Sequence, residues 1–143
     1  MSEPRFVFDT NVVVSAVLFL SSVPARALEV GQAVGRILVS EETAEELRRV
    51  LMRTRFDRYV SSVERARFLA RLLDDSALVQ IVEIIEDCRD SKDNKFLELA
   101  VSGGATHLIT GDADLLVLHP FRDVAIVTPQ VFLDEFSPPA VAE

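Results

Sequence analysis

Short apolar runs that do not alternate with polar residues place the strongest limit on the fold of this chain. Four such runs span residues 5–8, 36–40, 106–110 and 124–128, and a fifth spans residues 78–85. Strands that are apolar on both faces are typical of parallel sheets that helices cover on both sides. We therefore expect a central, mainly parallel sheet of about five strands, which is a common sheet size.

Between these runs, apolar residues recur at the three- and four-residue spacing of an amphipathic helix. Residues 12–20 are almost wholly apolar, and we expect a buried helix there because the segment is too short to span a bilayer. Strands that alternate with helices predict an α/β fold with right-handed crossovers. The helical patterns centre on residues 44–51, 66–73 and 96–100, with caps expected at Ser40 or Thr43, at Ser61 or Ser62, and at Gly103–Gly104.

The length and composition describe one globular domain with an acidic surface. The chain has 143 residues, 49% of them hydrophobic, and a net charge of -8. We expect one domain over residues 1–136 and a frayed tail over residues 137–143. The acidic balance argues against broad adhesion to nucleic acids, although a bound metal can reverse the local field. A single cysteine, Cys88, excludes an internal disulfide and favours a cytoplasmic location.

Three aspartates stand at the ends of predicted elements. Asp9 and Asp112 each follow an apolar run, and Asp93 opens a helical segment. Open parallel sheets bind ligands beyond the carboxyl ends of their strands, so these acids are placed to share one site. Clustered carboxylates repel one another, and a hard divalent cation with oxygen ligands relieves that repulsion. The pattern predicts a divalent-cation site whose carboxyl groups, without metal, include at least one with a raised pKa.

Helical phase selects a fourth acid between two neighbours. Glu46 adjoins Leu47 in the apolar stripe, so its side chain is expected to reach the cleft. Glu45 has Arg48 and Arg49 three and four residues later, which predicts ion pairs on the solvated face. Glu46 is therefore the predicted ligand, and Glu45 is not.

The other acids have simpler structural interpretations, which compete with a role in metal binding. Asp9 could serve only as a helix cap, and capping is the stronger interpretation for Asp90. Asp93 lies on the helix face that packs against the sheet, which makes it the better ligand of that pair. Asp114 either caps a short helix over residues 115–118 or binds a second metal through water. We expect Lys95 to be a solvated charge that could also meet a phosphate.

Four segments together resemble the PIN domain family, in particular its small prokaryotic VapC-like members. They read FVFDTNV, SEETAEELRRVL, RDSKDNKFLELA and TGDADLL, and the resemblance runs from Arg5 to Phe136. It implies a three-layer α/β/α sandwich and a metal-dependent ribonuclease. The signature acids of the family fall on Asp9, Glu46, Asp93 and Asp112, and its positioning residues fall on Thr10 and Asn11.

The resemblance also implies cofactors and partners. Mg²⁺ or Mn²⁺ would be the cofactor, RNA the substrate, and an antitoxin protein the partner of a VapC-like toxin. We expect a homodimer and no membrane association. Single-stranded RNA is favoured because an acidic protein meets the dense phosphate charge of a duplex poorly. Arginines that could line the rim of the cleft are Arg53, Arg55, Arg89 and Arg122.

Two other functions remain open from the residues alone. A phosphatase of the haloacid dehalogenase type also has an aspartate after its first strand, but it requires a second aspartate where this chain has Asn11. A non-catalytic metal-binding or regulatory domain would present the same acids without hydrolysis. A ribonuclease assay with and without chelator separates these functions.

Overall fold

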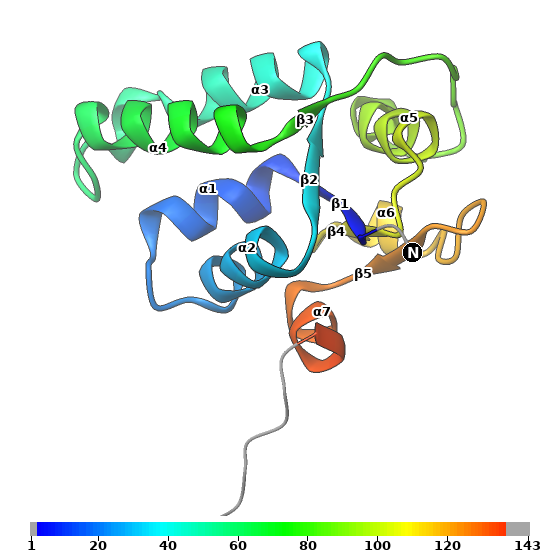
Figure 1. The fold of residues 1–143 in the computed structure, drawn as a ribbon. Coiled ribbons are helices and arrows are strands. Elements are labelled where there is room, and N and C mark those ends of the chain that lie inside the picture. Colours follow the sequence, from blue (N-terminus) through cyan, green and yellow to red (C-terminus); the bar gives the residue numbers. More distant parts are fainter. Residues whose placement is uncertain (1–2, 137–143) are drawn as a thin grey trace, which may run out of the picture.

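The computed structural model describes residues 3–136, and the tail predicted at residues 137–143 lies outside the described residues. Its centre is a five-stranded sheet with the order β3-β2-β1-β4-β5, in which every pairing is parallel (Figure 1). The strands are β1 (Arg5–Phe8), β2 (Arg36–Val39), β3 (Ala77–Leu78), β4 (His107–Ile109) and β5 (Ala125–Val127).

Helices cover both faces of this sheet and complete a three-layer α/β/α sandwich, which confirms the predicted fold class. Figure 1 shows α1, α2 and α7 on one side of the sheet and α5 on the other, while α3 and α4 extend together beyond its edge. The helices are α1 (Thr10–Leu18), α2 (Val23–Val34), α3 (Glu41–Leu51), α4 (Ser62–Asp75), α5 (Asn94–Gly103), α6 (Ala113–Leu116) and α7 (Pro129–Phe136), with 3₁₀ turns η1 (Thr54–Phe56) and η2 (Ser91–Asp93).

Helices pack against each face of the sheet and form a separate hydrophobic core there, so both faces of the strands are apolar. Phe6 and Phe8 pack with α1, α2 and α7, whereas Val7 between them packs with α5. In β4, Ile109 enters the first core and Leu108 the second. Successive side chains of a strand point to opposite faces, so a sheet buried on both sides requires an unbroken apolar run.

The predicted caps begin and end the helices around the site. Ser40 begins α3, where its hydroxyl and that of Thr43 form a reciprocal capping box. Ser61 begins α4 by accepting a hydrogen bond from a backbone N–H in the first turn. Gly104 ends α5 at φ 64°, a left-handed conformation that glycine adopts without steric cost. Each polar cap stabilises its helix by about 1 kcal/mol.

The fifth strand is shorter than the sequence predicts. Residues 78–85 were expected to form it, but pairing stops at Leu78 because β2 ends at Val39 and α3 begins directly afterwards. Side chains of α5 then hold the following loop: Ser102 accepts from the N–H groups of residues 82 and 83, and Glu98 accepts from that of residue 85. The apolar residues of this segment therefore form a loop fixed to α5.

Two helices were not predicted from the sequence. α2 begins at the Ser22 cap with Pro24 in its first turn, but its buried residues are only Ala27, Leu28 and Gly31. α7 begins directly at Pro129. The short helix predicted at residues 115–118 is α6, which begins two residues earlier, and its cap is Asp112 rather than Asp114.

The apolar segment near the start forms α1, which is mostly buried as expected. Within residues 3–136, no single helix has both the length and the hydropathy to cross a bilayer. α1 and α2 meet those limits only as a pair, and the pair is bent by 107°.

Candidate active site

Asp9 connects the end of β1 to the start of α1. Its backbone N–H donates to the carbonyl of Ile109 on the neighbouring strand, and its Oδ1 caps α1 by accepting from the N–H of Asn11 at 3.3 Å. The residue is only 5% exposed. Burial raises its pKa, the hydrogen bonds from Thr110 and Asn11 lower it, and the charges of Asp112 and Glu46 raise it again, with a net shift upwards. Asp9 thus caps α1 and also has a carboxylate that its surroundings disfavour in the charged form.

Asp112 lies beside Asp9, and one buried hydroxyl links the two residues. Thr110 Oγ1 donates to Asp9 Oδ2 at 2.7 Å and accepts from the backbone N–H of Asp112 at 3.0 Å. Asp112 Oδ1 caps α6 by accepting from the N–H of Asp114 at 2.8 Å. Because β1 and β4 pair directly, the carboxyl ends of these two strands bring both aspartates together.

Asp93 has the most unfavourable environment of these acids. It stands at the start of α5 without a capping hydrogen bond from its side chain, and its buried Oδ2 has no hydrogen-bond partner among residues 3–136. Burial, followed by the negative charges of Asp112 and Asp9, raises its pKa to about 7. Nearly all buried polar atoms in proteins have a partner, so this oxygen is the atom that most needs a cation.

Glu46 reaches the site from α3 and is held from two sides. Thr10 Oγ1 donates to Glu46 Oε2 at 2.6 Å, and Lys95 Nζ donates to Glu46 Oε1 at 3.0 Å. Lys95 also donates to the backbone carbonyl of Lys92. Its side chain is only 12% exposed, so the expectation of a solvated lysine was wrong. The lysine neutralises Glu46, whereas the three aspartates lack such a partner among the described residues.

The remaining predicted residues have peripheral positions. Glu45 is exposed, but the structure contains no ion pair between it and Arg48 or Arg49 among the described residues. Asp90 caps η2 by accepting from the N–H of Lys92. Asp114 lies in the first turn of α6, half-buried, where its backbone N–H serves the Asp112 cap.

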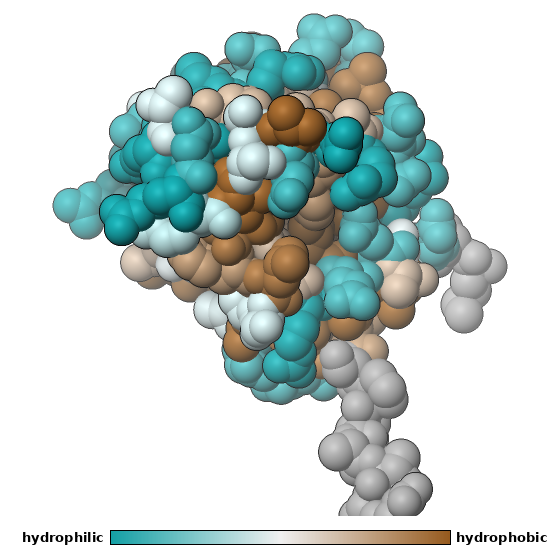
Figure 2. Space-filling view, turned by 90° about the vertical axis from the view of Figure 1, so that its left-hand side faces the viewer, coloured by the Kyte–Doolittle hydropathy of each residue, from teal (hydrophilic) through white to brown (hydrophobic). Residues whose placement is uncertain are grey.

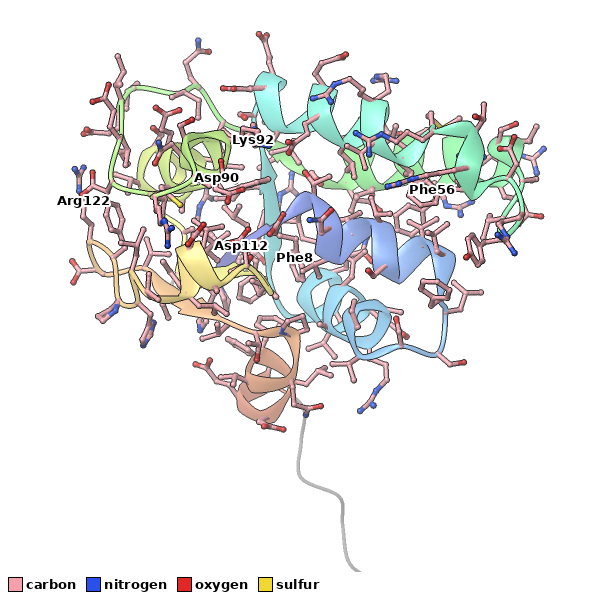
Figure 3. The ribbon with its side chains drawn as sticks, turned by 180° about the vertical axis from the view of Figure 1, so that it is seen from behind. Phe8, Phe56, Asp90, Lys92, Asp112 and Arg122 are labelled. Carbon is pink, nitrogen blue, oxygen red and sulfur yellow. The ribbon has the colours of Figure 1, made fainter. Side chains whose placement is uncertain are left out.

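The aspartates lie where the strand order changes direction. β2 and β3 extend the sheet from one side of β1, and β4 and β5 extend it from the other. A cleft of about 420 Å³ opens at the end of β1 and is lined by both Asp9 and Asp112. Figure 3 shows Asp112 close to the strand end that Phe8 marks. Asp93 and Glu46 do not line this cleft. Its other lining residues are Asn11, Val12, Ser15, Pro24, Gly111 and Pro129.

The donor set fits a hard divalent cation better than a soft one. Asp9, Asp93 and Asp112 offer only oxygen atoms, and one oxygen of Asp93 is buried without a partner. Among the described residues, however, no three acidic, histidine or cysteine side chains converge closely enough to hold one ion directly. Mg²⁺ keeps several waters and requires only one or two carboxylates, so this arrangement fits it.

Sequence reasoning missed three residues that organise the site. Thr110 is fully buried between Asp9 and Asp112, and Lys95 pairs with Glu46. Asn94 Oδ1 accepts from the N–H of Cys88 at 2.9 Å and so fixes the loop before η2. The hydroxyl directly after a predicted strand was the available signal for Thr110. Nothing local in the sequence connects Lys95 to an acid 49 residues away.

Comparisons with known proteins bear on the family and the fold of this chain. A family model described as PIN domain matches residues 5–114. The uncharacterized protein MJ1680 of Methanocaldococcus jannaschii is 25% identical over 142 residues, which cover 92% of this chain and 91% of the relative.

Two solved structures share the fold. PAE2754 from Pyrobaculum aerophilum matches with a TM-score of 0.62 and 16% identity, over 94% of this chain and 96% of that chain. VapBC2 from Rickettsia felis, solved bound to a DNA fragment from its promoter, matches with a TM-score of 0.57 and 13% identity, over 87% of this chain and 98% of that chain.

Proposed function

Because the chain belongs to the PIN domain family, a family of nucleases, we propose that it is a metal-dependent ribonuclease that hydrolyses phosphodiester bonds of single-stranded RNA. The observation that carries this proposal is the aspartate cluster, in which Asp9 is buried and Asp93 and Asp112 are half-buried. Asp93 leaves one carboxyl oxygen without a partner beside two further aspartates. Such an arrangement destabilises a fold that uses it only for structure, so we infer a role in binding a cation.

Asp9 and Asp93 would be the principal ligands of the cation, and Asp112 and Glu46 would be further ligands through water. A bound Mg²⁺ or Mn²⁺ supplies charge neutralisation at the phosphoryl oxygens and lowers the pKa of a water. Thr110 keeps Asp9 and Asp112 in their orientations through its two hydrogen bonds. Preorganised ligands of this kind reduce the reorganisation needed when charge develops.

Thr10 and Lys95 would hold the Glu46 carboxylate in a fixed orientation toward the site. Each donates to a different oxygen of the Glu46 carboxylate, which retains further lone pairs. Those lone pairs can accept a hydrogen bond from the attacking water and orient it. Asn11, which lines the cleft, would contact the substrate beside the cleaved bond.

An assay with purified protein tests this proposal directly. Labelled single-stranded RNA is incubated with the protein in Mn²⁺, in Mg²⁺ and in excess chelator. We expect cleavage in both metals and none in chelator, with duplex DNA cut more slowly than RNA. RNA left intact in both metals would favour the non-catalytic metal-binding alternative. Release of inorganic phosphate from a phosphomonoester, without chain cleavage, would favour the phosphatase.

We further propose that the chain acts as the toxin of a toxin–antitoxin pair in the cytoplasm, and that it is a homodimer. The fold shared with the Rickettsia felis VapBC2 structure supports the first proposal. Induced expression should arrest growth, and an Asp9→Asn variant expressed to the same level should not. Growth unaffected by the wild-type protein would count against a toxin, and light scattering of the purified protein tests the dimer.

A further inference from the structure

The arginines of this acidic chain are concentrated in one segment. Residues 48–71 hold eight of the fifteen basic residues and only two of the twenty-three acidic residues. This segment therefore carries a balance of +6 in a chain whose net charge is -8. It comprises the end of α3, the connector with η1 and most of α4, and we call it the basic arm. Its exposed arginines are Arg48, Arg49, Arg53, Arg55, Arg58, Arg67 and Arg71.

The basic arm is a direct extension of the candidate site. Glu46 lies in the middle of α3, and Arg49 follows three residues later on the same side of the helix. The connector that carries Arg53 and Arg55 begins directly after the end of this helix. At a rise of 1.5 Å per residue, this path along α3 covers about 10 Å. Figure 3 labels Asp112 near the middle of the molecule and Phe56, which belongs to the connector, toward its right-hand side.

A fully buried arginine holds the connector in a fixed shape. Arg65 is 0% exposed, and its guanidinium donates to the backbone carbonyls of Leu51, Arg53 and Val60 at 2.7, 3.1 and 3.0 Å. It also pairs with Asp57 in the same connector. A buried guanidinium is tolerated because these acceptors satisfy it. The hydrogen bonds of Arg65 thus fix the backbone of the connector, which carries exposed arginines.

Exposed aromatic rings accompany these arginines. Tyr59 is 51% exposed and meets Phe19, which is 48% exposed, with ring centroids 5.5 Å apart. The guanidinium groups of Arg55 and Arg58 lie over the rings of Phe56 and Tyr59. Figure 2, which faces this end of the molecule, shows hydrophobic surface in the middle of the face with hydrophilic groups around it. Arginines with exposed aromatic rings suit single-stranded nucleic acids, whose phosphates and bases are both accessible.

We propose that the basic arm binds the phosphate backbone of single-stranded RNA a few nucleotides from the bond that is cleaved, through Arg53, Arg55 and Arg58. This inference rests on the proposed function and adds the surface that holds the strand. The aspartates repel a polyanion at the point of cleavage, and the arm supplies the compensating attraction along α3. Salt dependence is the characteristic of such contacts, because each neutralised phosphate releases counterions.

The test compares two RNA substrates of different length. A dinucleotide contains only the cleaved bond, whereas a 12-nucleotide RNA extends to the connector. The arm variant is Arg53→Gln/Arg55→Gln/Arg58→Gln. The matched control is Arg26→Gln/Arg36→Gln/Arg122→Gln, which removes the same charge from exposed positions outside the arm. Arg122 is a suitable control position because it pairs with Glu83 and is not among the residues that line the cleft. Circular dichroism establishes that both variants are folded.

For the arm variant we expect the KM of the 12-nucleotide RNA in Mn²⁺ to rise about tenfold with kcat unchanged. Cleavage of the dinucleotide should stay as in the wild type, and the control variant should match the wild type on both substrates. The slope of log binding constant against log salt, measured by anisotropy of labelled RNA in chelator, should become shallower by about 2.

Two outcomes would overturn the proposal, and one separates it from the proposed function. Equal binding and cleavage of the long RNA by wild type and arm variant would exclude RNA as the ligand of the arm. If the arm and control variants lose RNA binding and cleavage equally, the cause is the change in net charge rather than the position of the arginines. If the wild type cleaves neither substrate, the proposed function fails, while anisotropy still tests the arm.

Discussion

At the scale of single residues, Asp93 combines a buried, unpartnered oxygen with a pKa raised to about 7 from an ordinary 3.8. The folded protein therefore holds this proton more tightly than the unfolded chain does. The associated stability is fully present below about pH 4 and is lost as the pH rises through about 7. In chelator, we expect the free energy of unfolding of the wild type to fall over this range relative to that of Asp93→Asn.

Urea unfolding at steps of pH, with both proteins in chelator, measures this difference. The Asp93→Asn variant is the matched control because its amide cannot titrate, while the other ionisable groups remain. Parallel stability curves for the two proteins between about pH 4 and pH 7 would show that Asp93 does not hold its proton as described.

Asp9→Asn should abolish cleavage and preserve the fold. The remaining carbonyl oxygen can still cap α1, and Thr110 can accept from the new amide in place of donating. The variant loses the charge that would hold a cation, so we expect activity in Mn²⁺ to fall at least about 100-fold, a loss of about 2.7 kcal/mol. Glu45→Gln changes an exposed acid outside the cluster and should retain activity within about twofold.

Both variants are assayed on labelled RNA beside a circular dichroism melt. Retained cleavage by Asp9→Asn, in a preparation free of contaminating ribonuclease, would overturn the proposed mechanism. A loss in both variants alike would indicate that acidity in general, rather than a metal site, supports the activity.

Sequence patterns indicated the positions of the acids at the candidate site better than the groups that contact them. Asp9 and Asp112 follow apolar runs, and strand ends are visible in one dimension. Helical phase likewise separated the half-buried Glu46 from the exposed Glu45. The Thr110 hydroxyl, by contrast, reaches an acid 101 residues away, and only the parallel pairing of β1 and β4 creates that contact.

At the scale of elements, the sequence predicted strands and helices where the local pattern agrees with the packing. It failed at residues 78–85, which have a strand-like composition but no neighbouring strand beyond Leu78. The composition of a segment indicates that it can form a strand, whereas the length of that strand depends on how far a neighbouring strand extends beside it. α2 was not predicted because few of its residues are buried. Ser22 gives a clear N-terminal cap, but Ala27, Leu28 and Gly31 alone do not produce a recognisable amphipathic pattern.

The connector between α3 and α4 depends on Arg65, and Arg65→Met should destabilise the fold by about 3 kcal/mol. Methionine fills much of the same volume but leaves the carbonyls of Leu51, Arg53 and Val60 without their donor. Asp57→Asn is the control: this side chain is 56% exposed and keeps an acceptor oxygen, so the cost should be at most about 1 kcal/mol.

Urea midpoints measure both variants, with an unchanged m-value as the sign that the same surface unfolds. Arg65→Met within about 1 kcal/mol of the wild type would mean that the connector satisfies its carbonyls in another way. Asp57→Asn as damaging as Arg65→Met would assign the stability to the ion pair instead.

At the scale of the whole molecule, sheet order and charge distribution converge on one end of β1. The strand order reverses there, which brings the aspartates together, and α3 leads from the same point to the basic arm. The protein thus has a negatively charged site and a positively charged arm, and its net charge is negative. A divalent cation would reverse the sign of the site and make the whole path attractive to a polyanion.

This arrangement predicts that metal binding stabilises the entire fold. A cation that binds the folded state at 100 times its Kd adds about 2.7 kcal/mol, which for a domain of this size raises Tm by about 8 °C. Because the cation displaces the proton of Asp93, the rise should be larger at pH 8 than at pH 6. Thermal melts in millimolar Mn²⁺ measure it, with NaCl of equal ionic strength as the control for screening. Asp93→Asn should show a much smaller rise, with little dependence on pH. A wild-type Tm that is indifferent to Mn²⁺ at both pH values would mean that the aspartates do not form a cation site, whatever the activity of the preparation.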